Sequence, residues 1–88
     1  MSNMLNSKHR KTLEAILSKP TKATIAWADI EKLFVALGGD VISKGGSVVT
    51  IKFSGRVNTF HRPHPQKEAK KWMVEKVREL LVEAGIKP

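Results

Sequence analysis

The sequence contains no cysteine. This absence excludes disulfide bonds, thiolate zinc sites and a cysteine nucleophile. No apolar run approaches the ~20 residues that a membrane-spanning helix needs. The opening segment, MSNMLNSKHRK, also lacks the apolar centre of a signal peptide. From these absences we expect a cytoplasmic protein that does not enter a membrane.

Motifs for nucleotide, covalent and metal chemistry are missing as well. The paired glycines belong neither to a GxxxxGKS/T loop nor to a GxGxxG turn, and no serine lies in a nucleophile-elbow sequence. His61 and His64 are three residues apart in a proline-containing stretch, and no cluster of acids supplies further metal ligands. We therefore expect neither a cofactor nor a metal ion.

What the sequence does have is positive charge in two segments. The chain has 88 residues, one small domain, with 16 Lys and Arg against 8 Asp and Glu. A domain of this size buries only ~60–65% of its unfolded surface, so we expect function on a surface or a shallow groove. Residues 44–71 hold seven basic residues and one acid, and residues 1–22 hold five and one. This concentration predicts a polyanionic partner, RNA or DNA before an acidic protein.

Three segments have apolar residues three and four positions apart, which predicts amphipathic helices over residues 7–20, 25–39 and 68–85. We expect Ser7 to cap the first helix and Pro20 to end it, while glycines end the other two.

Between the second and third helices, β-branched and aromatic residues predict strands over residues 40–44, 47–53 and 57–62, joined by turns at KGG and SGR. The order favours an α+β fold, in which helices pack on one face of a three-stranded antiparallel meander. We divide the chain into an N-terminal helical extension and linker, residues 1–24, and a main domain, residues 25–88.

The stretch NTFHRPHPQKEAKK combines two histidines with basic residues. Histidine changes its charge near neutral pH and serves as a general acid or base. RNA carries its own nucleophile, the 2′-hydroxyl, so cleavage without a metal needs only proton transfer and cations around the phosphate. The alternative is that His61 is a solvated strand residue and that His64 hydrogen-bonds to a turn carbonyl.

Four pieces in order, LFVALGG, GGSVVTIKF, GRVNTFHRPHP and LLVEAGI, resemble the HicA family of bacterial toxins over residues 25–86. The resemblance implies a small basic ribonuclease that cleaves messenger RNA, has a fold like that of the double-stranded-RNA-binding domain, and is neutralised by a HicB antitoxin. His64-Pro65 matches the family's His-Pro, and Arg62 and Lys67 match its basic surroundings. The predicted first helix is an addition to the family core.

The sequence departs from the family at one important place. HicA toxins have a catalytic histidine just after a Gly-Ser at the start of the second strand, whereas here Gly46-Ser47 precedes Val48 and Val49. Two functions therefore remain open: a metal-independent endoribonuclease, and a non-catalytic basic module that binds RNA or a protein. A third is an interaction protein whose basic face docks an acidic antitoxin.

His61 is the residue that we expect to compensate. A two-residue turn at Gly55-Arg56 would pair Thr50 with His61 and Val48 with Pro63. His61 would then lie diagonally across from Val48, within reach of a long side chain.

The predicted functional residues follow from these arguments. We expect catalysis by His61 and His64, and RNA contacts from Ser47, Lys52, Arg56, Arg62, Lys67, Lys70 and Lys71. We also expect a HicB-like antitoxin that buries Arg62, His64 and Lys67. A homodimer is one oligomeric state that we consider.

Overall fold

The computed structural model describes residues 5–86 as three helices and a three-stranded sheet. The elements are α1 Ser7–Leu17, α2 Trp27–Ala36, β1 Asp40–Ser43, β2 Val48–Phe53, β3 Arg56–His61 and α3 Lys71–Glu83. Their order and type confirm the predicted α+β fold with an additional N-terminal helix. No helix within residues 5–86 is long and apolar enough to cross a membrane.

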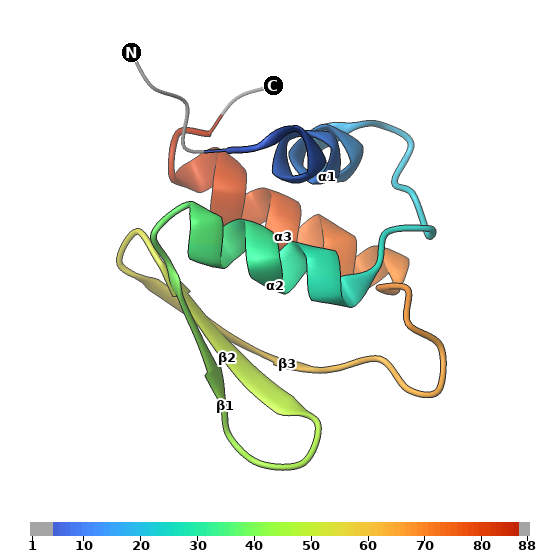
Figure 1. Cartoon of the computed structure of the whole chain (residues 1–88), viewed down its shortest axis with the longest axis vertical. Helices are drawn as coiled ribbons and strands as arrows, with labels where there is room; N and C mark the ends of the chain where they lie inside the picture. The colour runs from blue at the N-terminus through green and yellow to red at the C-terminus, as the bar shows by residue number, and fades with distance from the viewer. Residues whose placement is uncertain (1–4, 87–88) are drawn as a thin grey trace.

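The strands form an antiparallel meander in the order β1-β2-β3. Helices α2 and α3 lie between this sheet and α1, which contacts both of them (Figure 1). The sheet therefore has one face packed against helices. We call the other one the open face, because no described helix covers it (Figure 1).

The burial of the strand residues mostly follows this arrangement; Thr50, on the open face but only 5% exposed, is an exception. Val49, Ile51 and Phe60 point toward the helices and are 0%, 0% and 2% exposed, respectively. Their neighbours Lys52 and His61 are exposed on the open face. Because successive strand residues point to opposite faces, this pattern fixes which side chains are available to a partner.

The turn between β2 and β3 differs from the predicted one. Ser54 and Gly55, not Gly55-Arg56, are its two central residues, with φ of 54° and 78°. Positive φ at both positions suits the right-handed twist of a two-residue hairpin, and glycine adopts it without steric strain. The predicted pairing was therefore wrong: Thr50 lies opposite Thr59, and Val48 lies opposite His61.

The helix ends follow the expected chemistry with one correction. Asn6, rather than Ser7, caps α1, and its side-chain oxygen accepts a hydrogen bond from the backbone N–H of His9 at 2.8 Å. Gly38 and Gly85 follow α2 and α3 with φ of 92° and 87°. Both glycines thus provide the left-handed residue that was expected to end these helices.

Helix α1 is attached to the rest of the domain by its core and by one arginine. Ile16 is fully buried among residues of the other helices. Arg78 of α3 donates to the backbone oxygens of Ile16 and Ser18 at 2.9 and 3.2 Å, and to the Thr21 hydroxyl at 2.9 Å. Arg78 therefore satisfies carbonyls at the C-terminal end of α1 that have no partner within the helix.

Candidate nucleic-acid interface

The open face of the sheet carries polar side chains from two neighbouring strands, of which Thr59 is exposed and Thr50 is only 5% exposed. Thr50 and Thr59 are opposite each other, and their hydroxyl oxygens lie 3.1 Å apart, within hydrogen-bond distance. Cross-strand partners share a face, so the register assigns to this face Val48, Thr50 and Lys52 of β2, and Val57, Thr59 and His61 of β3. The open face thus has the His61 imidazole at one end and the threonine hydroxyls near its middle.

His61 ends β3 directly opposite Val48, the first residue of β2. Opposite side chains in an antiparallel pair have Cβ atoms roughly 4.5–5.5 Å apart. The side chain is exposed and has no hydrogen bond or ion pair with another described residue. The imidazole therefore lies closer to the start of β2 than the diagonal position predicted from sequence.

The basic neighbours of Arg62 suggested that its side chain is an exposed phosphate contact. In the structure this side chain is bound to other residues of the fold. Its backbone N–H donates to the Ser47 carbonyl at 2.7 Å, which joins the end of β3 to the turn before β2. Its guanidinium donates to Glu31 at 2.8 and 3.3 Å and to the Ser43 hydroxyl at 2.9 Å. The hydrogen bond to Glu31 raises the pKa of Arg62. Its charge is thus compensated within the fold, although it remains a predicted RNA contact.

Glu31 is the acid that holds the side chains of Arg62 and Trp27. Its carboxylate accepts hydrogen bonds from Arg62 and from the indole N–H of Trp27, one turn earlier in α2. The side chain of Glu31 is 19% exposed, so removing it would leave Arg62 without its anionic partner in a partly buried place. No local pattern in the sequence indicates this role of Glu31.

The loop after β3 is held against the segment that leads into α2. The backbone N–H of Trp27 donates to the Lys67 carbonyl at 2.9 Å, and the N–H of Ala69 donates to the Ile25 carbonyl at 2.8 Å. These bonds fix the backbone of Lys67 while its side chain stays exposed. His64 is also exposed in this loop, with no hydrogen bond to another described residue.

Lysines surround the beginning of α3. Lys70 is the N-cap residue and forms no side-chain cap, and the first turn of α3 contains no acid. The N-terminus of a helix carries partial positive charge, so a cation there is disfavoured by about 0.3–1 kcal/mol. Helix stability therefore does not explain Lys70 and Lys71, whereas an anionic partner would.

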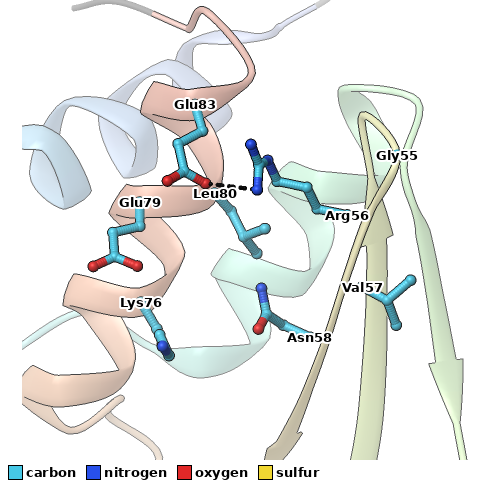
Figure 2. Close-up of a pocket in the computed structure, with 8 residues that line it drawn as sticks. All are labelled: Gly55, Arg56, Val57, Asn58, Lys76, Glu79, Leu80 and Glu83. Carbon is cyan, nitrogen blue, oxygen red and sulfur yellow. Dashed lines mark ion pairs between the residues drawn. The ribbon is translucent and has the colours of Figure 1, made fainter.

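Arg56 lies at the hairpin end of β2 and β3, where it and Lys52 line one groove, apart from the other predicted RNA contacts. It pairs with Glu83 of α3 at 3.1 Å on the helix-facing side of β3 (Figure 2). Arg56 and His61 are at opposite ends of a six-residue strand, which separates their backbones by about 17 Å. The Arg56–Glu83 pair borders a groove of about 440 Å³ between β3 and α3, lined by Gly55, Arg56, Val57, Asn58, Lys76, Glu79, Leu80 and Glu83 (Figure 2).

The predicted functional residues thus fall into four groups. His61 and Lys52 lie on the open face, at different ends of paired strands. His64, Lys67, Lys70 and Lys71 lie in the loop after β3 and at the start of α3. Ser47 and Arg62 join the end of β3 to the turn before β2. Arg56 shares the hairpin end with Lys52 but lies on the helix-facing side of β3. Within residues 5–86, no group of three or more histidine and acidic side chains has a metal-binding arrangement.

Comparisons with known proteins identify the family. The family model described as "HicA toxin of bacterial toxin-antitoxin" matches residues 27–86, which comprise α2, the whole sheet and α3. Neither the curated proteins nor the solved structures contain a match. The match leaves α1 outside the family core and covers well over half of the chain. The chain therefore belongs to the HicA family of bacterial toxin–antitoxin toxins.

Proposed function

We propose that this toxin is an RNA-binding, metal-independent endoribonuclease of the bacterial cytoplasm, with His61 in its active site and messenger RNA as its target. One observation supports this most directly. The pairing of β2 with β3 puts His61 opposite Val48, at the start of the strand where HicA toxins have their catalytic histidine. The exposed imidazole lies on a face that is open to a ligand.

The reaction that fits these groups is an internal transesterification. A histidine acting as general base takes the proton of the RNA 2′-hydroxyl, and the 2′-oxygen forms a bond to phosphorus. The bond from phosphorus to the 5′-oxygen breaks, and a general acid gives that oxygen a proton. The products are a 2′,3′-cyclic phosphate and a 5′-hydroxyl. His61 and His64 are the two candidates for proton transfer, and neighbouring lysines would stabilise the charge on the phosphate.

A non-catalytic binding module is the second candidate, and the valines after Ser47 favour it. Val49 is fully buried against the helices, and neither it nor Val48 can transfer a proton. In this case the toxin would block messenger RNA by binding alone. The same lysines would contact phosphate, while His61 would have no chemical role.

RNA binding is expected to weaken steeply with salt, because phosphate contacts release bound counterions. For single-stranded RNA, the slope of log K against log salt is about −0.7 per phosphate contacted. Replacing Lys67 with alanine should weaken binding to all sequences alike and reduce the slope by about 0.7. Fluorescence anisotropy at several salt concentrations measures both quantities. Binding that is independent of salt, or absent at low salt, contradicts the proposal.

An acidic antitoxin is expected to cover the loop after β3, because inhibition requires access to the phosphate-binding side chains. The Lys67→Glu variant should weaken the complex with the co-encoded protein by about tenfold or more, since it places like charges opposite one another. Lys19→Glu, an equal charge change at an exposed site beyond α1, is the matched control. Calorimetric titration measures both complexes. Equal losses in the two variants would indicate a general charge effect and no specific interface.

A further inference from the structure

Trp72 has an unusual position for a large aromatic residue. It is the second residue of α3 and is 53% exposed, whereas Trp27, Phe34 and Phe60 are at most 3% exposed. Fully burying a large apolar side chain contributes about 1.5–3 kcal/mol, and this small domain leaves much of that contribution unused at Trp72. The core therefore does not explain why the indole is there.

One face of the indole is supported from within the domain. The rings of Trp72 and Phe60 are nearly parallel, at an interplanar angle of 27° with centroids 6.4 Å apart. Phe60 in turn packs on Trp27, with centroids 5.0 Å apart. This row of three rings fixes the orientation of the exposed one. A ligand that stacks on Trp72 would meet a surface already held in place.

Within four residues of Trp72 the chain has three lysines, Lys70, Lys71 and Lys76, and two acids, Glu68 and Glu75. Lys70 and Lys71 precede it directly, and both are exposed where the helix dipole disfavours cations. The other large exposed apolar side chains among the described residues, Val35, Val57 and Val82, lie on α2, on the open face of β3 and in the last turn of α3. They do not extend Trp72 into an apolar patch of the kind that protein partners use. A ligand with both a flat aromatic group and negative charge fits better.

We propose that Trp72 is a stacking platform for an unpaired base of RNA, with Lys70 and Lys71 contacting the adjoining phosphates. Stacking on aromatic side chains and cations along the backbone are the usual means of binding single strands. In a duplex, both faces of each base are already occupied by neighbouring bases. The inference rests on the proposed RNA binding and narrows the substrate to single-stranded segments.

The test compares an unstructured oligoribonucleotide with the duplex of the same sequence, using the full chain. Trp72→Ala should lower single-strand affinity ~5–100-fold, the usual range for one stacked base, and leave duplex affinity unchanged. Trp72→Phe should restore most of the loss because it keeps an aromatic face. Val82→Ala, exposed on the same helix, is the control. Circular dichroism at the binding temperature establishes that each variant is folded.

Fluorescence provides a second measurement. Trp27 is buried and Trp72 is exposed, so acrylamide quenching reports mainly on Trp72. Saturating single-stranded RNA should protect the indole from acrylamide, and the duplex should not.

Each result distinguishes the platform from RNA binding in general. Equal single-strand affinity in Trp72→Ala and the wild type overturns the platform and leaves RNA binding standing. A wild-type protein that binds neither form of RNA overturns both. Loss of antitoxin binding with unchanged RNA affinity assigns Trp72 to the protein interface and overturns the platform.

Discussion

Replacing His61 with alanine is expected to lower RNA cleavage by ~10²–10⁴-fold, the usual contribution of a general acid or base. The reason is positional: His61 provides the imidazole at the start of the β2–β3 pair, where Val48 provides none. His64→Ala should cause a loss of the same order if His64 is the second proton-transfer group. Initial rates on a saturating oligoribonucleotide separate this loss from weaker binding, and mass spectrometry identifies the expected 2′,3′-cyclic phosphate.

The controls for this result are another histidine and a chelator. His9 belongs to α1 and is not on the open face, although it lines a pocket together with Arg62 and Ser43. Because proton transfer is assigned to His61 and His64, His9→Ala should cleave at the wild-type rate. EDTA should also leave the rate unchanged, and a loss in EDTA would reveal a metal requirement. Wild-type rates in both His61→Ala and His64→Ala would make the stretch a binding surface without chemistry. A pure wild-type protein that cleaves no RNA would favour the non-catalytic module.

Because successive strand residues point to opposite faces, only one of the two positions after Gly46-Ser47 can place its side chain on the open face. Val49 points into the core, and its partner Phe60 does the same, whereas Val48 and His61 share the open face. An imidazole at residue 49 would have to be buried among apolar side chains, where its charged form is disfavoured. Of the two positions after Gly46-Ser47, only residue 48, opposite His61, lies on the open face.

Much of the fold could be predicted from local patterns. The apolar spacing in α2 and α3 specifies these helices, since each has one buried face of helical periodicity. The β-branched run in β2 specifies its strand. The glycines after the helices marked their ends for the same local reason. The hypothetical turn at Gly55-Arg56 put His61 on the same face as Val48, and the observed register does so as well. Moving the turn by one residue changes the pairing by two positions, which preserves the face.

The remaining errors and omissions come from interactions that local sequence does not contain. Ser54 adopts positive φ, which is uncommon for a residue with a side chain, so the turn was assigned one residue too late. The contact between Glu31 and Arg62 spans 31 positions, and no periodicity indicates it. Trp72 directly precedes the buried Met73 in α3. How much of its indole is exposed depends on its contact with Phe60 of the sheet. Such features require the tertiary structure.

The side-chain alternation in β3 leads to the second large expected effect. Phe60→Ala should lower the free energy of unfolding by about 3–5 kcal/mol, the usual loss for a buried aromatic side chain. Phe60 is 2% exposed and packs between Trp27 and Trp72, so its removal leaves a cavity beneath both. Val57→Ala, three residues earlier in the same strand and 60% exposed, should change stability by roughly 0.5 kcal/mol or less.

Urea unfolding followed by circular dichroism measures both changes, and the comparison tests the register itself. A slip of one residue would turn every side chain of β3 to the other face. Val57 would then be buried, Phe60 exposed, and His61 would point into the core instead of toward RNA. A larger loss in Val57→Ala than in Phe60→Ala would therefore contradict both the pairing and the proposed active site. A larger loss of stability in Phe60→Ala than in Val57→Ala supports the register in which His61 lies on the open face. There a phosphate can approach its imidazole.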